Sequence, residues 1–210
     1  MLKQKIIPVT AYQQNCSLLW CDQTLEAALI DPGGDIKLLE AELKKQQLRL
    51  TQLWLTHGHL DHVGGTDELA AKYQAKIIGP HKDDSFWLDI LQQQCDMFNF
   101  PKVNQFTPEK WLKDGDSLTL GKEKFSVFHT PGHTPGHIVI VHHLSKTVWV
   151  GDVLFKNSIG RTDFPQGNHE TLIHSIRSRL FTLPDDYHFV PGHGEGGSLG
   201  SEKTNNPYLQ

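Results

Sequence analysis

A run of four metal-type ligands within six positions constrains this chain more than any other feature of its sequence. The four are His57, His59, Asp61 and His62. They follow an apolar stretch, residues 52–56, that we expect to be a buried strand. In extended chain the first two histidines point the same way, and a turn at Leu60 can bring the aspartate and the last histidine toward a second point. One loop can therefore serve two metal ions.

Four side chains are too few for two ions, so further ligands should lie at the ends of other strands, where loops gather on one edge of a scaffold. Three such turns combine small residues, which let the backbone turn, with a ligand-type side chain. Their ligand-type residues are His133, Asp152 and His193. Imidazole and carboxylate together suit Zn²⁺, Fe²⁺ or Mn²⁺. The sequence therefore predicts a metal site that several strand ends build together.

The order of expected elements indicates an α/β protein. Strands are expected at residues 5–9, 15–21, 27–31, 52–56, 76–78, 117–120, 124–129, 138–142, 147–151 and 188–190. Helices are expected at residues 36–47, with Asp35 as the N-cap, and at 66–73, 83–94 and 169–180. Two strand-rich halves with helices attached predict two sheets packed face to face with helices outside.

Composition and charge exclude several classes of protein. Apolar runs do not exceed four residues and the mean hydropathy is −0.41, so no segment is expected to span a membrane. The N-terminus lacks the apolar stretch of a signal peptide, and we expect a cytoplasmic protein. Lys and Arg number 20 against 24 Asp and Glu, which disfavours nucleic acid as a partner. The three cysteines have no Cys-x-x-Cys spacing, which argues against a disulfide framework or a zinc knuckle.

With these motifs, the chain resembles the metallo-β-lactamase-fold hydrolases from its first hairpin to Gly194. The resemblance implies a four-layer αββα sandwich with two mixed sheets face to face. It assigns one metal to His57, His59 and His133. It assigns the other to Asp61, His62 and His193. Asp152 would bridge the two ions, and Asp31 would be a supporting carboxylate near the loop.

The chain is most similar to glyoxalase II and its short bacterial relatives. The stretches that carry this similarity are TPGHTPGH at 130–137, GDVLF at 151–155 and GRTDFPQG at 160–167. Glyoxalase II hydrolyses S-lactoylglutathione, a thioester, to glutathione and D-lactate. Only 17 residues follow His193, so we expect the chain to lack the C-terminal helical region that supplies glutathione contacts in the long form. We therefore expect a single domain over residues 1–210.

The resemblance implies that a metal-bridging hydroxide cleaves a small-molecule substrate, with Asp61 and Asp152 as catalytic residues. Coordination lowers the pKa of bound water from 15.7 toward about 7, and the ions also polarise the substrate carbonyl. We expect these ions to be zinc, with iron or manganese as alternatives. Arg161 stands nine residues after Asp152, where glyoxalase II carries a substrate-contacting lysine. It could pair with a glutathione carboxylate, or form a salt bridge with Asp163.

Outside the ligand set, one histidine and the C-terminal tail remain to be assigned. His137 ends a turn and could orient a ligand. The remaining histidines are expected to be structural, namely His81, His129, His142, His143, His169, His174 and His188. The tail at 202–208 resembles an E-x-x-x-N-P-aromatic ending common in the short relatives, and we expect it to pack over the pocket rim.

Three other functions remain open. A persulfide dioxygenase shares the Gly-Arg-Thr-Asp-Phe stretch and uses one ferrous ion held by two His and an Asp. A lactone hydrolase would use the same attacking hydroxide on another ester. A non-catalytic module would use its cations only to hold loops together. The native metal, the acyl group and the oligomeric state are not specified by the sequence.

Overall fold

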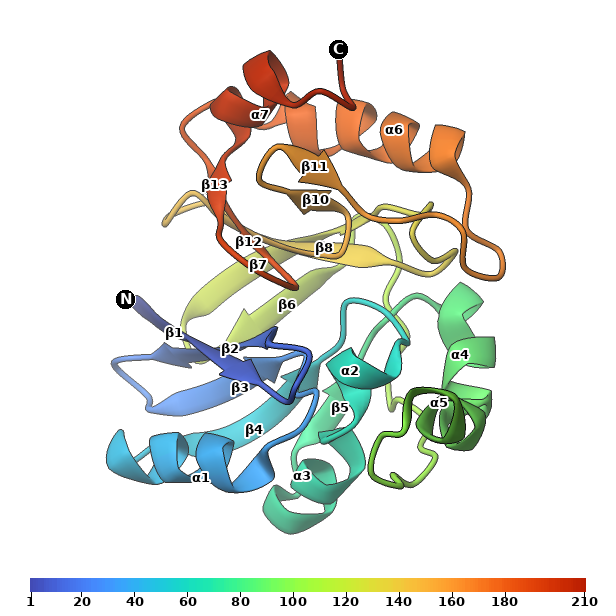
Figure 1. The fold of residues 1–210 in the computed structure, drawn as a ribbon. Helices are drawn as coiled ribbons and strands as arrows, with labels where there is room; N and C mark the ends of the chain where they lie inside the picture. Colours follow the sequence, from blue (N-terminus) through green and yellow to red (C-terminus); the bar gives the residue numbers. More distant parts are fainter.

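The computed structural model describes residues 1–210 as two β-sheets packed face to face between layers of helices (Figure 1). The first sheet has five strands, in the order β1 (Leu2–Val9), β2 (Gln14–Cys21), β3 (Glu26–Ile30), β4 (Arg49–Trp54) and β5 (Lys76–Ile78). The pairs β1/β2 and β2/β3 are antiparallel, whereas β3/β4 and β4/β5 are parallel. The sheet is therefore mixed, as predicted.

The second sheet has six strands in the order β13-β12-β9-β8-β7-β6. Their bounds are β6 (Ser117–Leu120), β7 (Glu123–His129), β8 (Ile138–His142), β9 (Thr147–Gly151), β12 (His188–Pro191) and β13 (Gly197–Ser198). Only β12/β9 is parallel, so this sheet is mixed as well. A separate small hairpin joins β10 (Leu154–Phe155) to β11 (Ser158–Ile159).

Helices form the two outer layers, which confirms the predicted αββα sandwich. On the side of the first sheet lie α1 (Ile36–Lys45), α3 (Thr66–Tyr73), α4 (Ser85–Asp89) and α5 (Leu91–Phe98). On the side of the second sheet lie α6 (His169–Ser178) and α7 (Leu199–Asn205). The shorter helices are α2 (Leu60–Val63), η1 (Lys82–Asp84) and η2 (Leu180–Thr182). None of the helices combines the length and the apolar character needed to cross a membrane.

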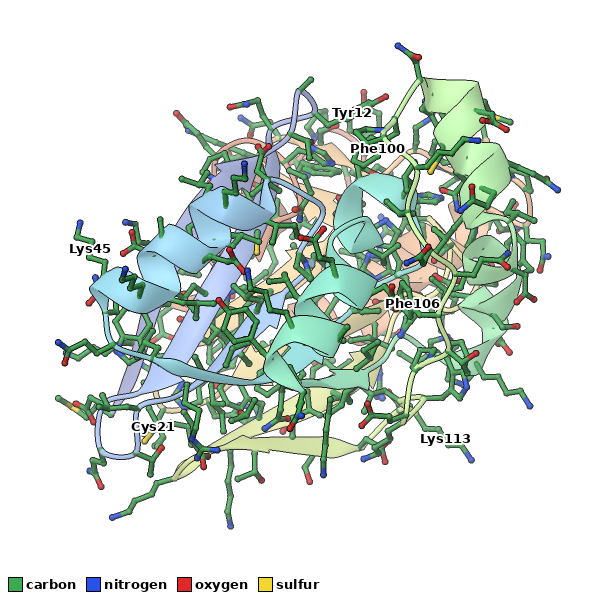
Figure 2. The ribbon with its side chains drawn as sticks, turned by 90° about the horizontal axis from the view of Figure 1, so that it is seen from below. Tyr12, Cys21, Lys45, Phe100, Phe106 and Lys113 are labelled. Carbon is green, nitrogen blue, oxygen red and sulfur yellow. The ribbon has the colours of Figure 1, made fainter.

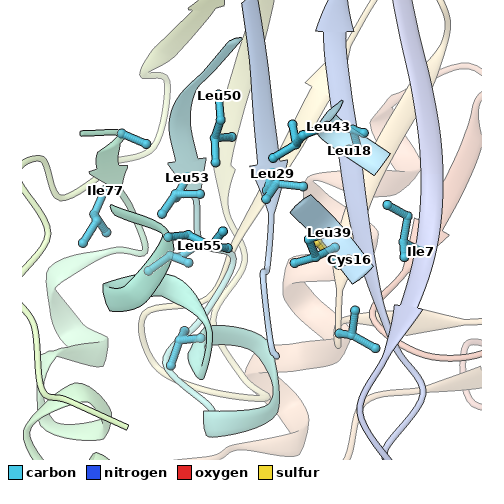
Figure 3. Close-up of a cluster of buried hydrophobic side chains, with 14 of the residues drawn as sticks. Ile7, Cys16, Leu18, Leu29, Leu39, Leu43, Leu50, Leu53, Leu55 and Ile77 are labelled. Atoms are coloured by element: carbon cyan, nitrogen blue, oxygen red, sulfur yellow. The ribbon is translucent and has the colours of Figure 1, made fainter. Parts of the chain in front are cut away.

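The central strands of each sheet are buried on both faces, which accounts for their nearly continuous apolar sequences. Along β3, Leu29 packs into the cluster under α1, whereas its neighbour Ile30 packs between the sheets. Figure 3 shows Leu43 of α1 beside Leu29 in this cluster under α1. Between the sheets, Trp54 meets Phe125 edge to face at 4.9 Å. Three stacked cores therefore hold the strand ends in fixed positions.

Most predicted elements are confirmed, and the differences have local causes. The hairpin β10/β11, the short β13 and α7 were not predicted, because each is too short to show a period. Asp35 does precede α1, but with a φ of 48° its side chain caps nothing and instead accepts a hydrogen bond from Thr10 N at 2.6 Å. The helix expected at 83–94 is divided into η1, α4 and α5, and the last of these extends to Phe98.

Two neighbouring leucines on α1 test the core under the first sheet. Leu39 is fully buried, whereas Leu38 is 48% exposed. We expect Leu39→Ala to lower the free energy of unfolding by about 2 to 5 kcal/mol, because it removes transfer energy and leaves a cavity. Leu38→Ala, with the same change in helix propensity, should cost less than about 1 kcal/mol. Equal losses in urea denaturation would contradict this assignment of the core.

Candidate metal centre

All seven residues expected to be ligands lie together at one edge of the two sheets. The edge is formed by the ends of β4, β7, β9 and β12, and each of these strands is followed within a few residues by a ligand-type side chain. Asp61 and His62 belong to the short helix α2, which marks this edge in Figure 1. Residues separated by up to 136 positions, from His57 to His193, are thereby brought to one place.

Three buried histidines form the first group. Nδ1 of His59 lies 3.1 Å from Nε2 of His57 and 3.1 Å from Nε2 of His133. Two nitrogens that share a tetrahedral ion at 2.0–2.1 Å stand about 3.3 Å apart, so this spacing suits a common cation. Burial lowers the pKa of all three imidazoles, that of His59 to about 3, and their lone pairs are free at neutral pH.

Asp61, His62 and His193 form the second group. Nε2 of His193 lies 3.2 Å from Oδ2 of Asp61, and Nε2 of His62 lies 3.9 Å from the same oxygen. Although burial lowers the pKa of His62, the carboxylates of Asp152 and Asp61 raise it well above its usual value. Likewise, the hydrogen bond from His193 to Asp61 outweighs burial and raises the pKa of His193. The two imidazoles therefore lie in a negative environment, which also suits a cation.

Asp152 lies between the two groups. Its Oδ1 is 3.4 Å from Nε2 of His62, and its Oδ2 is 3.8 Å from Nε2 of both His133 and His193. Despite burial, the neighbouring imidazoles, His62 above all, lower the pKa of Asp152. Oδ1 of Asp152 and Nε2 of His62 are buried without a hydrogen-bond partner. Such atoms are costly unless something compensates them, so the donor set fits divalent cations.

Asp31 holds both ligand groups from behind. Its Oδ1 accepts from Thr56 N at 2.8 Å, and its Oδ2 accepts from Thr56 Oγ1 at 2.6 Å and from His62 Nδ1 at 2.9 Å. Thr56 Oγ1 in turn lies 3.0 Å from Nδ1 of His57. These bonds use the Nδ1 atoms of both histidines and leave each Nε2 directed at the centre. The supporting position expected for Asp31 is the one observed.

His137 also lies behind the ligands. Its ring stacks on that of His57, with centroids 4.7 Å apart and planes inclined by 18°. Its Nε2 accepts the backbone N–H of Asp152 at 3.1 Å. These contacts are those of an orienting residue, which is the role considered for it from the sequence.

Asp84, which was not predicted from the sequence, connects two loops that carry candidate ligands. Its carboxylate is fully buried and accepts from Gly58 N at 2.9 Å, Thr134 Oγ1 at 2.8 Å and Gly136 N at 2.5 Å. Burial raises the pKa of Asp84 to about 6, although these three donors lower it. Its segment resembles an ordinary polar helix start, so no pattern in the sequence marks this contact.

Two neutral side chains that the sequence did not single out hold the other loops. Nδ2 of Asn15 donates to the carbonyls of Pro191 and Gly194, at 3.0 and 2.9 Å, and so fixes the turn that carries His193. Oε1 of Gln94 accepts from Leu60 N at 3.0 Å at the start of α2. Amide side chains of this kind are common on protein surfaces, and only the fold shows what they contact.

Glycine is required at position 192 because a ligand approaches it closely. A Cβ there would collide with the carboxylate of Asp152 and with the ring of His62. The small residues of this turn therefore do more than permit a bend. They leave room for the carboxylate of Asp152.

A cavity of about 400 Å³ opens beside the centre. His59, Asp61 and His193 contribute to its floor. Tyr12 and Phe100, close together in Figure 2 with ring centroids 6.0 Å apart, form part of its wall. On another side Trp87 and Phe164 meet the ring of His59 edge to face, at 4.5 and 4.7 Å. The cavity gives a small molecule direct access to the ligands.

Arg161 lines the cavity and also forms the salt bridge considered as the alternative. Its Nε and Nη2 each donate to the carboxylate of Asp163 at 2.6 Å, and its guanidinium lies 4.3 Å above the ring of Phe164. Its backbone carbonyl accepts from Nδ1 of His133 at 2.7 Å. The structure thus shows the salt bridge, and contact of Arg161 with a substrate carboxylate stays a prediction.

The C-terminal tail does not pack over the pocket rim, so that expectation was wrong. Buried Glu202 on α7 accepts from Asn157 N at 2.9 Å and from Asn206 Nδ2 at 2.8 Å, and the same amide donates to the carbonyl of Ser158 at 2.9 Å. The tail therefore anchors the β10/β11 hairpin, on the side of the second sheet.

A further cluster of His81, Asp83 and His129 lies outside the centre. Nδ1 of His81 accepts from Asp83 N at 3.3 Å, and Nε2 of His129 donates to the carbonyl of Pro135 at 2.9 Å. These bonds are consistent with the structural roles expected for both histidines.

Comparison with known proteins extends beyond the ligand motifs. Residues 9–193 match the family described as the metallo-beta-lactamase superfamily. The chain is 46% identical over 206 residues to the hydroxyacylglutathione hydrolase GloC of Haemophilus influenzae, a match that covers 98% of this chain and 97% of the relative. The crystal structure of BLEG-1 B3 metallo-beta-lactamase is 35% identical, with a TM-score of 0.92 over 99% of this chain and 100% of that one. That of TTHA1623 in a di-iron-bound form is 30% identical, with a TM-score of 0.88 over 98% and 100%.

The raised pKa of Asp84 gives a pH-dependent prediction for stability. Because the folded state binds this proton more tightly than the unfolded state, stability is lost as pH rises from about 4 to about 6. Both proteins are first freed of metal by a chelator. Over this pH window the free energy of unfolding of the native protein should fall by up to about 3 kcal/mol more than that of the Asp84→Asn variant. The exposed Asp89→Asn variant should follow the native curve. Parallel curves for the native protein and Asp84→Asn would contradict the prediction.

Proposed function

The chain belongs to the metallo-beta-lactamase superfamily, and we propose that it is a metal-dependent hydrolase of glutathione thioesters such as S-lactoylglutathione. The observation that carries the proposal is the position of the Asp152 carboxylate, between two groups of ligand-type side chains on the floor of an open cavity. The 46% identity with a hydroxyacylglutathione hydrolase over almost the whole chain supports the choice of substrate. Residues 1–210 would act as one domain.

The ligands would be divided between two ions. The first ion would be held by His57, His59 and His133. The second would be held by Asp61, His62 and His193. Asp152 would bridge them, and its unpartnered Oδ1 supports that role. Zinc suits this donor set, and iron is the first alternative because a similar structure holds two iron ions.

In this reaction the chain's own groups bind, orient and compensate charge. When bound, divalent ions would make hydroxide available at neutral pH and polarise the thioester carbonyl. Asp61 faces the cavity with its side chain 24% exposed, and the pKa of this carboxyl is lowered mainly by His62, against the effect of burial. It would therefore stay ionised and accept a hydrogen bond beside the reacting carbon. A thiolate leaves readily without a strong general acid, which agrees with a floor made of ligands.

Arg161 would contact a carboxylate of glutathione at the cavity rim. Its partner Asp163 is 65% exposed, and an exposed ion pair of this kind exchanges readily for another carboxylate. The guanidinium is already held over the ring of Phe164, so less conformational entropy is lost when the substrate binds.

A persulfide dioxygenase with one ferrous ion is the alternative function. It would need only two histidines and an aspartate, whereas the second group here offers three ligand atoms within 4.8 Å of one another. That second group supports the hydrolase. Lactones and β-lactams belong in the same substrate screen, the latter because a β-lactamase is among the similar structures.

Asp61→Ala tests the catalytic role of this partly buried carboxylate. We expect the rate of thioester hydrolysis to fall by two or more orders of magnitude, while the thermal unfolding transition persists. A loss on this order is typical when a group that stabilises the transition state is removed. Asp89→Ala, at an exposed position outside the cavity, should retain native activity. A purified Asp61→Ala protein with full activity would refute the assignment.

Metal content tests the division of ligands. Native protein should hold two ions, and His193→Ala should hold about one, because the second group loses a ligand while the first stays intact. His188→Ala, an exposed histidine on β12, should keep both. Elemental analysis gives the count. One iron per native chain, together with oxygen uptake on glutathione persulfide, would favour the dioxygenase instead.

A further inference from the structure

The walls of the cavity are almost entirely apolar once the ligands are set aside. The apolar and aromatic side chains in the lining include those of Tyr12, Trp87, Ile90, Met97, Phe100 and Phe164. Gln93 and Gln94 are neutral, and Arg161 is the only Lys or Arg side chain in the lining. A substrate that is polar throughout would leave most of this surface without a complementary partner.

The cavity has two chemically different ends. Beside the first ligand group, Phe164 contacts the ring of His59 and carries the guanidinium of Arg161 above it. Beside the second group, Tyr12 accepts a hydrogen bond from Nδ1 of His193 through its carbonyl, at 3.1 Å. The hydroxyl of Tyr12 donates to the carbonyl of Phe98 at 3.1 Å, which connects the loop after β1 to the end of α5. Apart from the ligand-type residues, only the first end offers a charged side chain, that of Arg161.

These two ends orient a glutathione thioester. The carboxylates of glutathione fit the end that carries Arg161, and the acyl group on the opposite side of the reacting carbon then extends toward Tyr12 and Phe100. At that end a lactoyl group would place its hydroxyl against apolar walls. An alkyl or aryl acyl group would bury its surface there.

We infer that this site prefers thioesters with a medium-length alkyl or an aryl acyl group over lactoyl. The inference rests on the proposed function, because it takes the glutathione thioester hydrolase as given and names its acyl specificity. Each fully buried methylene is worth about three- to fourfold in binding. Since the cavity is partly open, we expect a gain of at least about tenfold from acetyl to hexanoyl.

A series of glutathione thioesters assayed on the metal-loaded enzyme tests the preference. We expect kcat/KM to rise at least about tenfold from acetyl to hexanoyl, and benzoyl and hexanoyl to exceed lactoyl. A flat series, or lactoyl as the best substrate, would overturn the inference while the hydrolase assignment stands. The acetyl thioester of hexanethiol carries the apolar group on the thiol instead. If it were cleaved faster than S-hexanoylglutathione, the assignment of the acyl group to the apolar end would be wrong.

A matched pair of variants locates the effect in the cavity. Met97 lines the rim and is 74% exposed, whereas Leu144 is 87% exposed in the β8–β9 turn, away from the cavity. Met97→Glu should reduce kcat/KM for the hexanoyl thioester at least about threefold more than for the lactoyl thioester, because it places a charge beside the alkyl chain. Leu144→Glu should change neither. Equal effects of Met97→Glu on both thioesters would contradict the inference.

Binding of a thioether that cannot be hydrolysed separates the two proposals. S-hexylglutathione should bind the metal-loaded protein at least about tenfold more tightly than S-methylglutathione in calorimetry. If no thioester is cleaved but this ratio holds, the proposed reaction fails and the apolar cavity remains assigned to an alkyl group. Equal affinities for the two thioethers would overturn the inference whether or not thioesters are cleaved.

Discussion

Compensation of buried charge at Asp152 is the interaction on which the rest of the centre depends. A carboxylate at this depth is stable only if positive charge surrounds it, and five imidazoles and the carboxylate of Asp61 share that region. Burial lowers the pKa of the imidazoles in the first group, whereas the neighbouring carboxylates raise the pKa of His62 and His193. The negative charge that raises these two pKa values also suits cations. The centre is therefore organised by its electrostatics before any substrate arrives.

Residues outside the ligand set give this arrangement its precision. Asp31 fixes His62 directly and His57 through Thr56, while Asp84 joins the loop after β4 to the turn after β7. Each of these carboxylates accepts several hydrogen bonds from groups that are distant in sequence. Displacing one ligand loop would therefore break bonds in another. Because the three packed cores already fix the strand ends, these few bonds are enough to set ligand positions.

The sequence predicted the layers and most strands, because these depend on local patterns. Short apolar runs identify β8 and β9, and the spacing of His57 and His59 after a strand identifies a candidate ligand loop. The contacts of Asp84 could not be predicted, since two of its three partners are backbone N–H groups that any residue could supply. The role of Glu202 could not be predicted either, although the motif that contains it was recognisable. Its partner is the β10/β11 hairpin, which has only two residues in each strand. Long-range pairing of short elements leaves no period to detect.

The loop around Arg161 supports a neighbouring histidine and also lines the cavity, and it does so with different groups. Its backbone carbonyl supports His133, whereas its side chain faces the cavity. The same holds on the opposite wall, where Tyr12 supports His193 through its carbonyl and presents its ring to the cavity. Side chains at these positions can be exchanged during evolution while the carbonyls that hold the ligands stay in place. A scaffold built this way can acquire new substrates by ordinary point mutation and keep its metal chemistry throughout.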